Sequence, residues 1–243
     1  MATLRIVLRE ALYREMTDAD PFAGVGQIHY ETITRSALSK EAVIALLDRK
    51  RWDDQLFWEA TKTAAATGMR AGEIRALQWG DLRPPIVVVR RNLPGESTEA
   101  VAPKWGKPRV CPYSPGLQKL LEPRRGADKA YVFSRSGGPI GYKRWSAAVR
   151  EAAAAARAAA IKAAGDNDPP AYVEELPHAS LHVLRHTLNT ALRGQGHNDE
   201  LLRGAFGWSS ADIQEEYTHR EGYDYSGLAA SIDDFFKGAK DGG

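Results

Sequence analysis

The spacing of apolar positions predicts a series of helices in the N-terminal part of the chain. Residues 4–16 carry apolar side chains at mixed helical spacing, and the segment after them breaks the pattern. Ser39 precedes an apolar run over residues 40–47 with an acidic residue in its first turn, which is typical of a capped helix start. A longer helix is expected over residues 53–66, and Gly68 suits its C-terminal stop.

Strand signals follow in the middle of the chain. Ile86–Arg90 is rich in β-branched residues and follows two prolines, so it is the clearest predicted strand. Residues 101–110 predict a second and a third strand around a turn at Trp105-Gly106. The pattern then becomes helical again, and the expected helices cover residues 142–164, 181–194, 198–206, 210–218 and 226–237.

Composition sets wide bounds on the class of protein. The 243 residues suffice for one large or two small domains with a proper core. Hydrophobic and charged contents of 43% and 26% are those of an ordinary soluble protein, and apolar runs stay shorter than the roughly 20 residues of a membrane span. Residues 1–5 lack the apolar segment of a secretory signal, and the single Cys111 excludes an internal disulfide. We therefore expect a cytoplasmic protein.

The distribution of charge is more informative than the net charge of +2. Residues 101–150 hold eleven Lys and Arg against two acidic residues, a local charge of +9. Residues 166–243 hold six against fourteen, a local charge of −8. This asymmetry fits one electropositive region that neutralises phosphates, and a solvated basic surface explains it equally well.

Six short segments, in this order, resemble the motifs of one enzyme family. They are Thr67-Gly-Met-Arg-Ala-Gly-Glu73, Leu77-Gln-Trp-Gly-Asp81, Lys104-Trp-Gly-Lys-Pro-Arg-Val-Cys-Pro112, Leu181-His-Val-Leu-Arg-His-Thr187, Phe206-Gly-Trp208 and Glu216-Tyr-Thr-His219. Their order and local spacing resemble the catalytic domain of the tyrosine recombinases, the phage integrase family. The resemblance covers roughly residues 37–225, and it departs from the family pattern at Trp208, at Phe206 and in an insertion near 166–176.

The resemblance implies a mainly α fold with a small antiparallel β-sheet (α+β), the DNA breaking-rejoining catalytic-domain fold of tyrosine recombinases. It also implies a domain organisation. Residues 1–30 would be the terminal helix of a truncated N-terminal core-binding domain and its linker, and residues 31–225 the catalytic domain. Residues 226–243 would form a tail helix that docks either on its own domain or on a neighbouring subunit.

Arg70 and Arg185 are the arginines of two of these motifs. A guanidinium group is permanently charged, planar and bidentate, so it suits two non-bridging phosphate oxygens better than a lysine does. The resemblance implies that both bind the scissile phosphate. Glu73 lies three residues after Arg70, where an ion pair or hydrogen bond that orients an arginine is its expected role.

The C-terminal motifs supply the nucleophile and its surroundings. The resemblance implies that Tyr217 attacks the phosphate, whereas Tyr223 and Tyr225 match no motif. His182 precedes Arg185 by one helical turn, and its imidazole could accept or donate a proton. Trp208 stands where many family members have histidine; its indole donates a hydrogen bond but cannot exchange protons, and a plain core tryptophan stays the alternative.

Lys104 is the candidate acid for the departing 5′-hydroxyl, because a lysine can protonate an alkoxide that an arginine would protonate poorly. Lys107 is the second candidate for that role. Lys107 and Arg109 are otherwise expected to contact the DNA backbone. The other candidate DNA-binding residues are Arg90, Arg91, Lys143 and Arg144.

The predicted function is site-specific DNA recombination through a 3′-phosphotyrosyl intermediate. The ester conserves the bond energy, so the resemblance implies neither a metal, nor ATP, nor another cofactor. The implied partners are double-stranded DNA, three further copies of the chain in a tetramer on DNA, and accessory DNA-bending proteins, with a nucleoid-associated location and no membrane. A type IB topoisomerase and a non-catalytic DNA-binding module are the alternatives.

Overall fold

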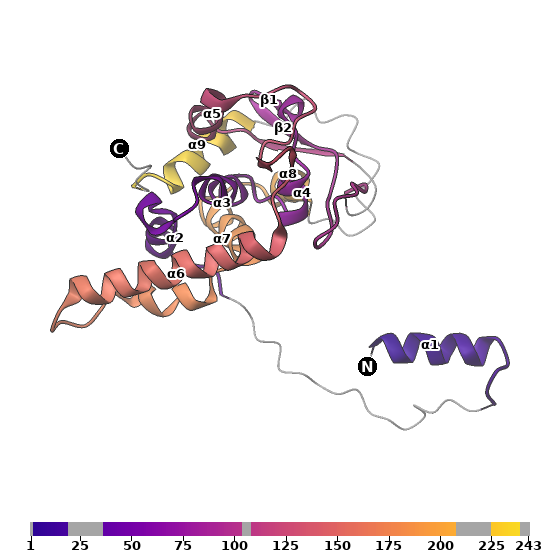
Figure 1. Ribbon diagram of the computed structural model, residues 1–243. Helices are drawn as coiled ribbons and strands as arrows, with labels where there is room; N and C mark the ends of the chain where they lie inside the picture. Colours follow the sequence, from indigo (N-terminus) through magenta and orange to yellow (C-terminus); the bar gives the residue numbers. More distant parts are fainter. Residues whose placement is uncertain (1, 19–35, 104–107, 208–224, 239–243) are drawn as a thin grey trace. The chain divides into compact units, whose positions relative to one another are not determined.

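The computed structural model describes residues 2–18, 36–103, 108–207 and 225–238. By its contacts the chain divides into two compact units, Met1–Thr34 and Arg35–Gly243. The first unit contains helix α1 (Ala2–Tyr13), labelled in Figure 1. Large apolar side chains on and beside α1 are exposed, among them Ile6 and Tyr13. The remaining elements belong to the second unit.

The second unit begins with two capped helices, α2 (Lys40–Leu47) and α3 (Gln55–Thr67). The hydroxyl of Ser39 and the carboxylate of Asp54 accept hydrogen bonds from backbone N–H groups of the first turns. Gly68 ends α3 in the left-handed conformation, with φ of 58°. The predicted N-cap at Ser39 and the predicted stop at Gly68 are therefore confirmed.

Helix α4 (Ala71–Arg75) follows directly and is short. Its last residue, Arg75, is almost completely buried. The guanidinium group of Arg75 donates hydrogen bonds to the backbone carbonyls of Leu93, Gly95, Ser97 and Ile140. This arginine fastens the loop over residues 92–100 to α4, close to the position of Arg70.

A small antiparallel sheet has the strand order β1-β2-β3. Its strands are β1 (Leu82–Arg83), β2 (Ile86–Val89) and β3 (Arg109–Pro112), and Val89 lies opposite Arg109. The predicted strand 86–90 is confirmed as β2. The strand expected at the start of residues 101–110 is replaced by one isolated bridge between Asn92 and Val101. A separate hairpin pairs β4 (Ser134–Arg135) with β5 (Gly138–Pro139).

Helix α5 (Pro115–Leu121) follows the sheet, and the long helix α6 (Tyr142–Ala164) runs past α2 and α3 in Figure 1. The alanine-rich tract within α6 is helical, as predicted. Its buried face lets neighbouring segments approach closely because alanine side chains are small. Short 3₁₀ helices fill the connections at Arg49–Arg51, Trp79–Asp81, Glu122–Arg124, Ala171–Glu174 and Leu176–His178.

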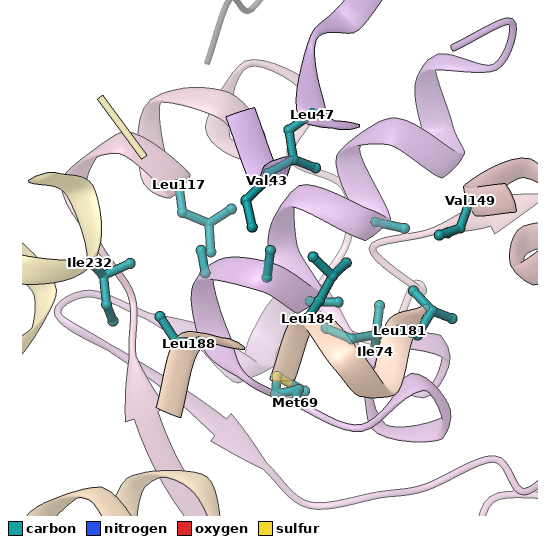
Figure 2. Packing of buried hydrophobic residues seen from close by; sticks show 14 of the residues in the cluster. Val43, Leu47, Met69, Ile74, Leu117, Val149, Leu181, Leu184, Leu188 and Ile232 are labelled. Atoms are coloured by element: carbon teal, nitrogen blue, oxygen red, sulfur yellow. The ribbon is translucent and has the colours of Figure 1, made fainter. Parts of the chain in front are cut away.

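Three further helices complete the described unit: α7 (Leu181–Gly194), α8 (Asp199–Phe206) and α9 (Tyr225–Phe235). Helix α7 packs on α3, and Figure 2 shows its Leu184 and Leu188 in the apolar core. Helix α9 packs on α5, α7 and β3 of the same chain, with Ile232 fully buried. The helix expected over 210–218 lies outside the described residues.

In the part of the chain that the structure describes, the architecture is helix-rich with two small antiparallel sheets, which confirms the predicted fold class. Helices α3, α4, α7 and α8 bring segments distant in sequence to one place, where Arg70 and Arg185, two of the candidate catalytic residues, lie. None of the helices in the described ranges combines the length and apolar character needed to cross a membrane.

Candidate active site

Glu73 is the centre of a buried cluster of charged side chains. Its carboxylate accepts two hydrogen bonds from Arg109, from Nη1 to Oε1 at 2.7 Å and from Nη2 to Oε2 at 2.6 Å. The same carboxylate accepts hydrogen bonds from Arg70, from its Nη1 at 3.1 Å and from its backbone N–H at 2.7 Å. The ion pair expected for Glu73 is thus present, and it involves two arginines, one three residues before Glu73 and one 36 residues after it.

The acidity of Glu73 reflects these contacts. Burial alone would raise the pKa of its carboxyl group. The hydrogen bonds and positive charges of Arg109, followed by those of Arg70, outweigh burial and lower the pKa from 4.5 to about 2. Glu73 is therefore ionised at neutral pH, and it holds the two guanidinium groups in fixed positions.

Arg185 reaches the cluster from α7 and is only 4% exposed. Its guanidinium group donates hydrogen bonds to the backbone carbonyls of Gly68 and Phe206. Burial, followed by the positive charges of Arg70 and Arg109, lowers the pKa of Arg185 to about 9. The group remains charged at neutral pH.

The carbonyls that Arg185 binds stand at the C-terminal ends of α3 and α8. The C-terminus of a helix carries a partial negative charge, so these two ends stabilise a buried guanidinium group. With Arg70, Arg109 and Glu73, the cluster has three positive groups and one negative group, a net charge of +2.

Gly207, the C-cap of α8, lies beside two arginines of the cluster, Arg70 and Arg109. Its φ of 64° lies in the left-handed region, and its carbonyl accepts a hydrogen bond from Arg70 Nη2 at 3.1 Å. A Cβ at this position would lie 3.1 Å from Cδ and 3.1 Å from Nε of Arg109. The backbone conformation and the close approach of Arg109 therefore both favour glycine.

The two histidines of α7 are exposed. His182 lies one helical turn before Arg185, as predicted, and is open to solvent while Arg185 is buried. His186, the residue after Arg185, is also exposed. Within the described ranges, histidine, cysteine and carboxylate side chains do not gather in groups of three or more that could hold a metal ion.

Four predicted site residues lie outside the described residues: Lys104, Lys107, Trp208 and Tyr217. Gly207, the last described residue before Trp208 in the sequence, lies at the cluster. The roles of these four residues stay predictions.

The candidate DNA-binding residues divide into two groups. Arg90 and Arg91 both pair with Asp81, although the side chain of Arg90 remains 42% exposed. Lys143 and Arg144 are exposed in the first turn of α6, where the carboxylate of Glu96 accepts a hydrogen bond from the backbone N–H of residue 143 at 2.6 Å. Their contact with DNA stays a prediction.

Arg109 differs from the expectation that it contacts the DNA backbone. It is 7% exposed, and its guanidinium group binds Glu73 inside the protein. The physical reason is its position in β3, where pairing with Val89 directs this residue toward the interior. Gly207 was also not predicted to be a residue of the site. The signal that could have identified it is a glycine directly after a predicted helix.

Comparison with known proteins identifies the family of the chain. A family model described as the phage integrase family matches residues 41–222. The chain is 37% identical over 95 residues to the prophage integrase IntR of Escherichia coli (strain K12). That alignment covers 38% of this chain and 22% of the relative, so the chain spans less than a quarter of that protein.

Two solved structures have a similar fold. The Tn1549 transposon integrase (aa 82–397) in complex with circular intermediate DNA has a TM-score of 0.63 and 18% identity, covering 94% of this chain and 76% of that chain. A lambda integrase tetramer bound to a Holliday junction has a TM-score of 0.59 and 17% identity, covering 87% of this chain and 58% of that chain. Because the family model covers most of the sequence and the fold agrees, the chain belongs to the phage integrase family.

Proposed function

We propose that the chain is a site-specific DNA recombinase that cleaves and rejoins DNA strands through a 3′-phosphotyrosyl intermediate. The observation that carries the proposal is the convergence of Arg70 and Arg185, from segments 115 residues apart, on the neighbouring carbonyls of Gly207 and Phe206. A cluster of net charge +2 around one carboxylate is suited to an anionic phosphodiester.

In the proposed reaction the phenol oxygen of Tyr217 attacks the scissile phosphorus. A tyrosyl–phosphorus bond forms and the bond to the 5′-oxygen breaks, while Lys104 protonates the departing oxygen and the imidazole of His182 accepts the phenol proton of Tyr217. Arg70 and Arg185 stabilise the negative charge that develops on the non-bridging oxygens. A 5′-hydroxyl of another strand then attacks the phosphotyrosyl ester and restores both the DNA backbone and the tyrosine.

His182 and Trp208 complete the proposed constellation. His182 is exposed in the first turn of α7, and its proposed role is proton exchange with the reacting groups. Trp208 would donate its indole N–H to a phosphate oxygen, and its place in the chain, directly after Gly207, supports this role. In this proposal neither role requires a metal or a nucleotide cofactor.

The proposed partners are double-stranded DNA and further copies of the chain. The Tn1549 and lambda integrases were solved with DNA, and the lambda integrase as a tetramer on a Holliday junction. We infer that four copies act together on two duplexes, with basic residues such as Lys143 and Arg144 near the DNA backbone. Accessory DNA-bending proteins and a nucleoid-associated location belong to the same proposal.

The test uses nicked duplexes that carry the end sequences of the genetic element encoding the chain, because a nick releases a short strand and traps the covalent intermediate. We expect an SDS-resistant protein–DNA adduct whose modified residue is Tyr217 by mass spectrometry. Tyr217→Phe should abolish the adduct, whereas the control Tyr225→Phe should retain it. An adduct on another tyrosine, or an adduct formed by Tyr217→Phe, would contradict the proposal.

The same preparation separates the alternatives. Supercoil relaxation by single subunits, with religation of the original strand, would favour a type IB topoisomerase. DNA binding without any adduct would favour a non-catalytic binding module.

A further inference from the structure

Arg109 belongs to none of the roles proposed above, yet it links its own strand to two other parts of the site. Its guanidinium group makes a two-pronged ion pair with Glu73, which in turn binds Arg70. Its Cδ and Nε lie against Gly207, the residue that precedes Trp208. Its own strand, β3, begins five residues after Lys104. One buried side chain therefore joins the segments that carry three of the proposed catalytic residues.

The charges of this cluster explain why a second arginine is needed. A carboxylate that faced Arg70 alone would cancel its positive charge, and little attraction for a phosphate would remain. In the structure, Glu73 shares its two oxygens between Arg109 and Arg70. Glu73, Arg109 and Arg70 together therefore keep one net positive charge. Arg70 is the more exposed of the two arginines, with 30% of its side chain accessible against 7% for Arg109.

Geometry adds to the effect of charge. The paired N–H groups of Arg109 fix the plane of the Glu73 carboxylate, because both oxygens are held at 2.6–2.7 Å. That plane determines where Arg70 Nη1 is held, at 3.1 Å from Oε1. A lysine at position 109 would keep the charge but could not hold both oxygens in one plane.

We propose that Arg109 is a positioning residue of the recombination reaction, which acts through Glu73 to direct Arg70 at the scissile phosphate. The inference rests on the proposed function, since it assigns a role to a residue of the same site. It differs from the expectation that Arg109 contacts the DNA backbone, and it differs from a role in stability alone.

The experiment compares conservative variants of two arginines that each pair with a buried glutamate. Arg109→Lys keeps the charge of the cluster, which limits the risk of misfolding that Arg109→Met carries. Arg124→Lys is the matched control, because Arg124 pairs with buried Glu59 at 2.6 Å elsewhere in the fold. Arg70→Ala is the reference for loss of the phosphate contact itself.

Each variant is assayed for the rate of adduct formation on two nicked duplexes. One carries the natural phosphodiester at the cleavage point, and the other a methylphosphonate, in which a methyl group replaces one charged oxygen. We expect Arg109→Lys to slow adduct formation by about 100-fold on the phosphodiester, as a small misplacement of a catalytic group does. On the uncharged methylphosphonate the loss should shrink by at least about tenfold, as for Arg70→Ala, because less negative charge has to be stabilised.

Affinity for DNA provides the second readout. A side chain that neutralises a DNA phosphate contributes about one unit to the slope of log Kd against log salt concentration. We expect this slope to be unchanged in Arg109→Lys and in Arg109→Met. Arg124→Lys should lower thermal stability without a change in the adduct rate of the folded protein on either duplex.

Three results would overturn the inference. If Arg109→Lys slows adduct formation equally on both duplexes, while Arg70→Ala slows it less on the methylphosphonate, Arg109 has a structural role only. A smaller salt slope in Arg109→Met would instead make it a DNA contact. If the unmodified chain forms no adduct at Tyr217 on either duplex, the proposed function fails and this inference fails with it.

Discussion

The carboxylate of Glu73 holds two arginines of the site, so its neutralisation gives a quantitative test of the buried cluster. Glu73→Gln keeps the shape of the side chain and removes the charge. The shift of the Glu73 pKa from 4.5 to about 2 corresponds to about 3 kcal/mol of folding stability. Removal of one partner from a buried ion pair typically costs about 3–5 kcal/mol, which agrees with this value.

The dependence on pH follows from the sign of the shift. The pKa of Glu73 is lower in the folded protein than in the unfolded chain, so its contribution is complete above the unfolded value of 4.5. The contribution is lost as the pH falls toward about 2, because protons then bind the carboxylate. About 2 kcal/mol of it should disappear between pH 7 and pH 3. A glutamine side chain is not protonated in this pH range, so the Glu73→Gln variant does not lose this stability between pH 7 and pH 3.

The assay is urea denaturation at pH 7, 5, 4 and 3, followed by tryptophan fluorescence. We expect Glu73→Gln to be less stable than the unmodified protein by at least about 3 kcal/mol at pH 7, and this difference should narrow toward pH 3. Glu151→Gln, on the exposed face of α6, is the control and should change stability by less than about 0.5 kcal/mol. A difference that stays constant from pH 7 to pH 3 would refute the reasoning.

Two further predictions concern the C-terminal part of the fold. Gly207→Ala should lower adduct formation and cost about 1–3 kcal/mol of stability, whereas Gly165→Ala, with a φ of 59° and no atom near its Cβ, should cost stability alone. Adduct rates and thermal unfolding check this, and equal effects of both variants on activity would contradict it. Deletion of residues 226–243 removes three large buried side chains and should unfold the chain in circular dichroism. A folded deletion variant that no longer assembles on DNA would instead support exchange of the tail between subunits.

Local signals in the sequence account for the parts of the fold that were predicted. The N-cap at Ser39 and the stop at Gly68 each depend on one residue and its immediate neighbours. The pairing of Glu73 with Arg70 is equally local, since the two lie on one helical turn. A single sequence is sufficient for such features because their physical cause lies within a few residues.

The position of Arg109 has no such local cause. An arginine in a short strand after a basic segment fits a surface contact, and its neighbours in sequence give no indication of Glu73, 36 residues earlier. The register of β3 against β2 and the packing of α8 on β3 together place Arg109 inside the protein. The missing strand near residue 101 has a similar explanation, since Arg75 holds the preceding loop through backbone carbonyls that a continuous strand would use for pairing.

The burial of Arg185 indicates why these segments must converge. A pKa lowered from 12.5 to about 9 corresponds to about 5 kcal/mol of electrostatic cost in the free protein. The partial negative charges at the ends of α3 and α8 offset part of this cost, because Arg185 donates to both. A bound phosphate would offset more of it, as its charge opposes that of three neighbouring arginines. Binding of the phosphodiester would therefore be favoured by relief of the electrostatic cost of Arg185 in the free protein. The two helix ends that stabilise Arg185 in the free protein are brought together by the fold, and the sequence alone does not predict that they meet.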